Sequence, residues 1–348
     1  MRGSRRWLPA ILIPAAIAAA AVIAPLQAGA ATDLADLSAD QLVQRVAASD
    51  AEAFSGTFEQ ESQLGLPDLS LPGNAPQSEA GAASALELAT GSHTGRVYVD
   101  GADHVRVQVL DALAERDAVR NGDEVWLYSS KQNEATHASL PDGSADAALS
   151  NAQTPGQLAE HFLTLAREDA RLSVAADGSV ADRPTYTLVI TPTSTDTLVG
   201  DVRISVDAAT WVPLRVIVRA RGVSDPAFSL GFTTFDTARP DAERFAFTPP
   251  AGATVTERTV PAGTRHVSAA DDSAAPLVHG SGWDAVAEFA TGALPAELEA
   301  SPLFSQLTNR VEGGRAVTTS LASLLLTDDG RILAGAVPLS RLQAAAAE

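Results

Sequence analysis

Residues 104–109 read His-Val-Arg-Val-Gln-Val, and residues 120–128 read Arg-Asn-Gly-Asp-Glu-Val-Trp-Leu-Tyr. Valines alternate with polar residues in the first stretch, which is the period of a β-strand with one buried face. In the second stretch, the pair Asn121-Gly122 favours the tight turn of a β-hairpin. The two stretches therefore predict neighbouring antiparallel strands.

Similar strand patterns occur on both sides of this hairpin. We expect further strands at residues 54–60, 94–99, 117–120, 124–129, 134–138, 171–175, 185–191, 200–206, 212–220 and 228–234. A sheet with so many strands must curl. The predicted fold class is therefore α+β: an antiparallel half-barrel sheet whose concave face is covered by helices and encloses an apolar cavity.

Two helices are predicted to supply that cover. Residues 38–48 carry apolar side chains at helical spacing behind Ser38, a suitable N-cap. Residues 154–168 begin with the N-cap Thr154 and place Pro155 at the first helical position, where proline is favoured. The apolar side chains of this second helix lie along one side, so the helix is expected to pack on a sheet.

The first 31 residues have the features of a secretory signal peptide. Arg5 and Arg6 precede an apolar stretch over residues 8–26, and the small residues at 27–31 fit a cleavage site. The alternative is an uncleaved segment that tethers the protein to a membrane, although three prolines interrupt the stretch. Both alternatives predict an exported protein, in the periplasm, in the cell envelope or outside the cell.

Composition limits the partners that the chain can have. Its 348 residues carry a formal net charge of −19, which excludes nucleic acid as a partner. The absence of cysteine removes disulfides, thiolate metal sites and the acylated cysteine of a bacterial lipoprotein. Lys131 is the only lysine, and this bias toward arginine indicates a GC-rich genome.

The chain beyond the signal segment is predicted to have two parts. Residues 32–258 hold the strands and form the half-barrel. The composition changes in residues 259–348, where we expect a helix at 295–308 and a hairpin around Asp-Asp-Gly at 328–330. The pattern leaves open whether this extension is a separate domain or adds strands to the main sheet.

Three segments, in this order, resemble those of a known family. Residues 54–60 (Phe-Ser-Gly-Thr-Phe-Glu-Gln) are similar to the family's first strand, and residues 120–128 to its strand with tryptophan and tyrosine. Residues 245–253 (Phe-Ala-Phe-Thr-Pro-Pro-Ala-Gly-Ala) are similar to its closing segment. On these segments, residues 50–257 resemble the LolA superfamily of periplasmic lipoprotein carriers and the related MucB/RseB sensors.

The resemblance implies a half-barrel of about eleven strands whose apolar cavity holds a lipid or the acyl chains of a lipoprotein. Residues 100–102 read Asp-Gly-Ala where the Gram-negative carrier has the arginine that latches its lid, so this latch is not expected here. Residues 261–348 exceed the simple carrier in length, which favours a longer relative of the actinobacterial type.

A carrier needs an apolar concavity rather than catalytic residues. The predicted lining consists of apolar strand residues and one side of the helix at 154–168: Val97, Val99, Val105, Val107, Trp126, Tyr128, Leu158, Phe162, Leu165, Val216, Val218, Leu230 and Phe232. For each of these residues, ordinary core packing is the competing interpretation. Arg106, Arg203, Arg215 and Arg219 alternate with apolar residues and are interpreted as solvated.

The sequence thus predicts an exported carrier or binding protein with no catalytic residues, cofactor or metal, whose partner is a lipid or an acylated lipoprotein. One alternative is an RseB-like envelope sensor that binds a membrane-anchored anti-sigma factor. A second alternative is a cofactor-free lipid hydrolase, for which the sequence offers no nucleophile motif.

Overall fold

One large curved β-sheet dominates the part of the chain that the structure describes. The structure is a computed structural model, and it describes residues 34–49, 51–66, 91–111, 114–140, 154–259, 276–290 and 306–347. Asp36–Glu348 forms one compact unit. The predicted signal segment at 1–31 lies outside the described residues, and so does most of the predicted helix at 295–308.

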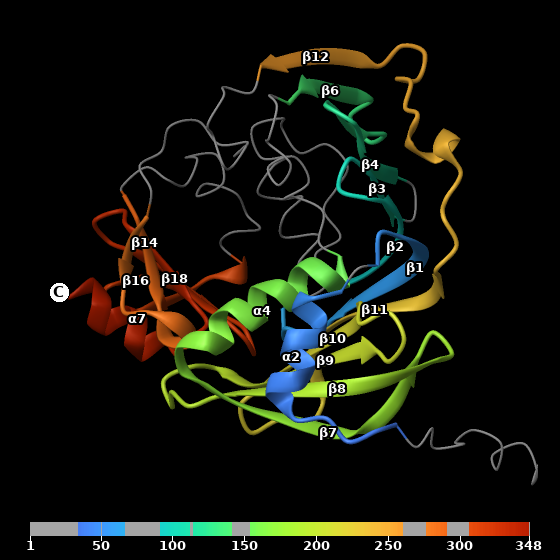
Figure 1. Cartoon of the computed structure of the whole chain (residues 1–348). Helices are drawn as coiled ribbons and strands as arrows, with labels where there is room; N and C mark the ends of the chain where they lie inside the picture. The colour runs from blue at the N-terminus through green and yellow to red at the C-terminus, as the bar shows by residue number, and fades with distance from the viewer. Residues whose placement is uncertain are drawn as a thin grey trace, which may run out of the picture. The chain divides into compact units, whose positions relative to one another are not determined.

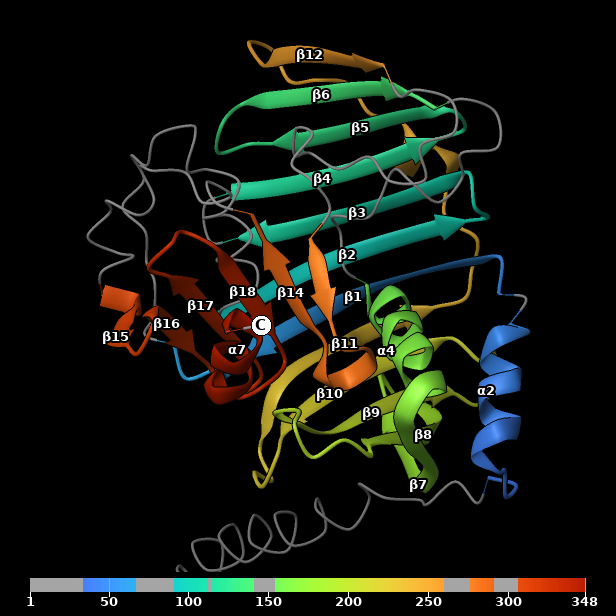
Figure 2. The ribbon, with the colours of Figure 1, turned by 90° about the vertical axis from the view of Figure 1, so that its left-hand side faces the viewer.

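The large sheet has twelve strands in the order β12-β6-β5-β4-β3-β2-β1-β11-β10-β9-β8-β7 (Figure 2). The strands are β1 (Ala53–Ser62), β2 (Gly91–Asp100), β3 (His104–Asp111), β4 (Ala114–Asn121), β5 (Glu124–Ser129), β6 (Glu134–Ser139), β7 (Ala170–Val180), β8 (Arg183–Pro192), β9 (Val199–Asp207), β10 (Pro213–Ala220), β11 (Pro226–Asp236) and β12 (Thr254–Thr259). Neighbouring strands are antiparallel except β12 and β6, which are parallel.

The sheet is open, because its edge strands β12 and β7 are not paired with each other. Figure 1 shows it curving around helix α4. The predicted α+β half-barrel is therefore confirmed, with twelve strands rather than about eleven, since β12 returns to extend the edge formed by β6.

Alternation of buried and half-buried residues follows from the period of the strands. In β10, every second residue from Leu214 to Ala220 is buried, and the same pattern holds over Tyr186–Pro192 in β8 and Val202–Val206 in β9. Leu214 belongs to a core that includes Phe58, Leu230 and Phe232. This core fixes the curvature and the register of the central strands, because a shift by one residue would expose its apolar side chains.

The two helices predicted at residues 38–48 and 154–168 are both present. Helix α2 (Ala39–Ala47) begins behind Ser38, and α4 (Pro155–Asp169) begins behind Thr154; each cap forms a reciprocal capping box with the glutamine three residues on. Helix α4 contacts β7, β8, β10 and β11, and its Leu158 packs against the core. It therefore lies over the concave side of the sheet, as Figures 1 and 2 show.

The C-terminal residues form a sheet of their own, in the order β13-β14-β18-β17-β16-β15. Its elements are β13 (Leu277–His279), β14 (Val286–Phe289), β15 (Asn309–Val311), β16 (Gly314–Thr318), β17 (Ser323–Thr327), β18 (Ile332–Gly335) and helix α7 (Leu339–Ala346), with the short 3-10 helix η3 (Gly282–Asp284). Leu325, Leu333 and Leu342 are buried in its core. No helix in the described ranges is long and apolar enough to cross a membrane.

Candidate functional site

A cavity of about 510 Å³ lies between the concave face of the large sheet and the first turns of α4. Its volume falls within the range of small-molecule pockets. The lining residues are Phe54, Val97, Val99, Ala102, Val105, Val107, Arg120, Thr154, Gly156, Gln157, Glu160, Val212, Pro213 and Phe232. We call it the sheet cavity.

The strand register explains why these side chains meet. Phe54 pairs with Val99, Val99 with Val105, and Val105 with Arg120, so that one row crosses four strands. In the next row, Val97 pairs with Val107 and with Gly56. Residues directly opposite each other point to the same face of a sheet. Both rows therefore face α4.

Aromatic rings close one wall of the sheet cavity. The rings of Phe54 and Phe232 meet edge to face with centroids 6.4 Å apart, and Phe54 stacks on Phe235 at 5.3 Å. Such pairs add stabilisation beyond the burial of area alone. The wall is thus a fixed apolar surface.

The opposite end of the sheet cavity is polar. The side chain of Arg120 is only 5% exposed; its Nη2 lies 2.8 Å from Oδ1 of Asp103, and its Nε donates to the carbonyl of Gly122. Helix α4 contributes Gln157 and Glu160 to the lining. The cavity therefore suits a ligand with an apolar body and a hydrogen-bonding end.

Five of the predicted lining residues meet in the sheet cavity: Val97, Val99, Val105, Val107 and Phe232. The sequence interpretation missed Phe54, Arg120 and the first turn of α4. Phe54 was identifiable, because it lies at even spacing from Phe58 in the predicted first strand. Arg120 was not, because its place in the row depends on the register across the hairpin.

Four others line a second cavity, of about 310 Å³, next to the C-terminal sheet: Leu158, Phe162, Leu165 and Val218. Val216 and Leu230 are fully buried and line neither cavity. These two residues are therefore part of the packed core, as the competing interpretation held.

Trp126 and Tyr128 lie on the other face of the sheet. Leu127, between them, pairs with Ala118, which pairs with Val107, whereas Trp126 pairs with Val119. The indole of Trp126 stacks on His137 at 4.2 Å, and both aromatic residues contact Phe247. The predicted cavity lining is thus wrong for this pair, because alternation within a strand does not reveal which face is concave.

Arg106, interpreted as solvated, also lies on this second face and is bound. Its Nε lies 3.1 Å from Oδ1 of Asp117, whose side chain is 2% exposed, and its Nη1 donates to the carbonyl of Arg244. Burial raises the pKa of Asp117 by more than hydrogen bonding and the charge of Arg106 lower it. Arg106 thus fastens the segment around Arg244 to the sheet.

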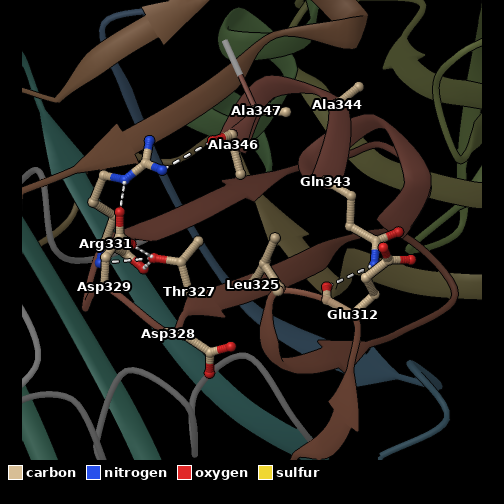
Figure 3. A pocket seen from close by; sticks show the side chains of 11 residues that line it. Glu312, Leu325, Thr327, Asp328, Asp329, Arg331, Gln343, Ala344, Ala346 and Ala347 are labelled. Atoms are coloured by element: carbon tan, nitrogen blue, oxygen red, sulfur yellow. Dashed lines mark hydrogen bonds and ion pairs between the residues drawn. The ribbon is translucent and has the colours of Figure 1, made fainter.

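A third hollow, of about 580 Å³, lies between α7 and the hairpin of β17 and β18 (Figure 3). The side chain of Arg331 lines this hollow. Its Nε lies 3.0 Å from Oδ2 of Asp329, and its Nη2 donates to the carbonyl of Ala346. Glu288 binds Nη1 of the same guanidinium. These bonds tie α7 to the hairpin. No three His, Asp or Glu side chains in the described part of the chain are placed to hold a metal ion.

A family described as "Predicted periplasmic protein (DUF2092)" matches residues 83–257. The chain belongs to this family. Membership of DUF2092 confirms the exported, periplasmic location predicted from the sequence. No curated protein matches the chain.

Several solved structures are similar to this DUF2092 protein. One is a chain in the structure of the MucA/MucB complex from Pseudomonas aeruginosa. It is 19% identical in sequence to this chain, the match covers 88% of this chain and 96% of the solved chain, and the TM-score is 0.43. An uncharacterized conserved protein from Thermus thermophilus has 14% identity, 63% and 99% coverage and a TM-score of 0.37. A LolA superfamily protein from Nitrosomonas europaea has 12% identity, 61% and 99% coverage and a TM-score of 0.27. These names include the LolA superfamily and MucB, which residues 50–257 resemble in sequence.

Proposed function

We propose that the protein is a periplasmic binding protein that holds an acyl chain of a lipid or of an acylated lipoprotein in the sheet cavity. The observation that supports this function is the lining itself: Val97, Val99, Val105, Val107 and the rings of Phe54 and Phe232 surround a volume of about 510 Å³. Each methylene group that leaves water for such a surface contributes about 0.8 kcal/mol. A chain of ordinary length therefore gains enough to remain bound in an aqueous compartment.

The polar end of the sheet cavity supports a ligand with a head group. Gln157 offers an amide on the first turn of α4, in the same cavity as the buried guanidinium of Arg120, which binds Asp103 and the carbonyl of Gly122. The Gln157 amide can donate hydrogen bonds to carbonyl or acidic oxygens. Carriage of this kind breaks no bond, so it requires neither a catalytic residue nor a cofactor.

A second candidate function is a sensor that binds a membrane-anchored protein. Leu277 and Val278, on the edge strand β13, are 62% and 56% exposed. An exposed apolar edge strand is suited to pairing with another chain. Among the similar structures, MucB is seen in complex with MucA(peri).

The first experiment is native mass spectrometry of the protein purified from its own exported compartment, followed by extraction of what is bound. A stoichiometric lipid or acylated peptide is expected. A bare mass, together with a specific complex formed by a membrane-anchored partner, would favour the sensor function instead.

The position of the ligand is tested by filling the sheet cavity. Val105→Trp places an indole among the lining residues, and Val223→Trp makes the same change at a surface position that is 52% exposed. We expect Val105→Trp to weaken binding of a fluorescent fatty acid at least tenfold, and Val223→Trp to leave it unchanged. Equal binding by the two folded variants contradicts the assignment of this cavity.

A further inference from the structure

We propose that the protein forms a homodimer in which strand β12 pairs antiparallel with β12 of a second copy. The pairing joins the two large sheets into one, and it does not depend on what the sheet cavity holds. β12 is the outermost strand of its sheet (Figure 2), and in the part of the chain that the structure describes it pairs only with β6. It is therefore an edge strand, the element that accepts a further strand most readily.

The outer edge of β12 offers backbone donors and acceptors. The amide of Thr254 donates to the carbonyl of Asn133, in the turn before β6, at 2.9 Å. The peptide groups of successive strand residues point to alternate edges of the strand. The backbone groups of Thr254 and Thr256 therefore point to β6. Those of Val255 and Glu257 point away from β6, where a further strand can bind them.

The side chains of β12 leave this edge accessible. The residues from Thr254 to Arg258 are all exposed, and Val255 is 45% exposed. Many edge strands are protected from pairing by a charge. Glu257 does not protect this one, because its Oε2 lies 2.7 Å from Nδ1 of His137 and is thereby held over its own sheet.

The register of the pairing follows from the two faces of the strand. A two-fold axis normal to the sheet relates the copies and keeps side chains of the same face opposite each other. If Glu257 stood opposite its own copy, two like charges would meet. When Thr256 stands opposite its own copy, Val255 stands opposite Glu257 of the second copy. This register pairs the most strand residues without opposing like charges.

Backbone bonding in this register is regular. Val255 and Glu257 of the second copy both direct N–H and C=O groups outward, so they exchange two hydrogen bonds. The two-fold axis generates the same pair again. Between these pairs, the two copies of Thr256 form a non-hydrogen-bonded pair, with Cα atoms about 4.5 Å apart. Threonines opposite each other are a favourable cross-strand pair.

Charges on the concave face of the pairing are complementary. Thr254 pairs with Glu134 on β6, and in this register Arg258 of the second copy stands opposite Thr254. The Cα atoms of Glu134 and this arginine are then about 9 Å apart across two strand spacings, a gap that the two long side chains can span. The contact occurs twice in the dimer. A second copy of this chain therefore fits the edge better than a strand of arbitrary sequence.

A single introduced cysteine reports the register, because the chain contains no cysteine. In Thr256→Cys, the two thiols of a dimer lie beside the two-fold axis, at a Cα separation that a disulfide can bridge. Thr254→Cys is the matched control on the same face of the same strand, but its two copies lie roughly 14 Å apart. Under mild oxidation, we expect Thr256→Cys to form the disulfide-linked dimer roughly tenfold faster than Thr254→Cys.

Sedimentation equilibrium tests the dimer without cysteine. The apparent mass of the wild-type protein is expected to rise from monomer to dimer with concentration. Val255→Pro removes an outward N–H and leaves the bonds from β12 to β6 in place, so it should fold and remain monomeric. Leu277→Pro, at the first residue of the exposed edge strand β13, is the matched control and should dimerise like the wild type. Thermal unfolding checks that each variant is folded.

Two kinds of result overturn the proposal. One is equal cross-linking of Thr256→Cys and Thr254→Cys, or a wild-type monomer at every concentration. The other is dimerisation that is lost in Leu277→Pro and kept in Val255→Pro, which would mean that the copies meet at β13. Should Val255→Pro unfold, the two cysteine variants still decide the question, because both changes lie at exposed positions of β12.

Discussion

Arg183 binds both carboxylate oxygens of Asp207, with Nε 2.7 Å from Oδ1 and Nη2 2.9 Å from Oδ2. Thr210 donates to the same carboxylate from its hydroxyl and from its amide. Burial would raise the pKa of Asp207, whose side chain is 1% exposed, but the hydrogen bonds from Arg183 and Thr210 outweigh it and hold the pKa below its ordinary value. The pair joins β8 to the end of β9, and its contribution to stability depends on the charge of Asp207.

Replacement of Asp207 by Asn is expected to lower the free energy of unfolding at pH 7 by about 3 kcal/mol, because it leaves Arg183 without its carboxylate. The pKa of Asp207 is lower in the folded chain than its unfolded value of about 3.9, so the stabilisation is complete above that value and is lost as the pH falls through the folded-state pKa. Urea denaturation of both proteins should show a difference that is constant down to about pH 5 and shrinks below about pH 4.

The control for this change is Asp328→Asn, since Asp328 pairs with Arg310 where both side chains are more than half exposed. Exposed pairs contribute roughly 0 to 1 kcal/mol. Two outcomes would show that the ion pair of Arg183 and Asp207 does not stabilise the junction of β8 and β9. One is an effect of Asp207→Asn no larger than that of Asp328→Asn, and the other is an effect that does not change between neutral and acidic pH.

His137 connects the parallel edge strand to the sheet. Its Nδ1 lies 2.7 Å from Oε2 of Glu257 on β12, and its Nε2 contacts Oε2 of Glu124 on β5. Burial lowers the pKa of His137, but the hydrogen bonds and charges of the two glutamates outweigh it and raise the pKa above 6.5. A raised folded-state pKa means that the stabilisation is complete below about 6.5 and is lost as the pH rises through the folded-state value.

We therefore expect β12 to loosen from β6 as the solution becomes alkaline. An NMR titration of the His137 ring should have a midpoint above 6.5, and Glu257→Gln should lower that midpoint. Amide exchange in β12, corrected for the intrinsic effect of pH, should accelerate over the same interval. Glu243→Gln, at an exposed position outside this cluster, serves as the control. If Glu257→Gln does not move the midpoint, the contact between His137 and Glu257 does not raise the pKa of His137.

The sequence predicted the sheet and its covering helices because both depend on local pattern. The alternation at residues 104–109 and the Asn121-Gly122 turn appear as β3, β4 and β5, and the capping box behind Thr154 starts α4 where expected. The residues of one strand that share a face could be predicted as well. Val105 and Val107 do line the same cavity.

What local pattern could not predict is how the faces of different strands combine. The register places Leu127 rather than Trp126 in the row of Val107, so the aromatic pair lies on the wrong side for a lining. Likewise, the apolar stripe of α4 that includes Phe162 meets Trp283, which lies far along the chain in the C-terminal part. Such contacts between distant segments leave no trace in the period of either segment.

Gly95, in strand β2, leaves room for the ring of Phe58 to pack against it. A Cβ added to Gly95 would lie 2.2 Å from Cζ of Phe58, on a backbone that is otherwise ordinary β-strand. Gly95→Ala should therefore force Phe58 out of the core and lower the free energy of unfolding by about 2 kcal/mol.

Gly178→Ala is the matched control in the same sheet, because the added Cβ there would lie 3.5 Å from Oγ1 of Thr185, an ordinary contact. We expect the control to be neutral or slightly stabilising, since alanine restricts the unfolded chain. Phe58→Leu added to Gly95→Ala should recover part of the loss in urea denaturation; equal stability of the two single glycine variants would mean that the core around Phe58 can relax.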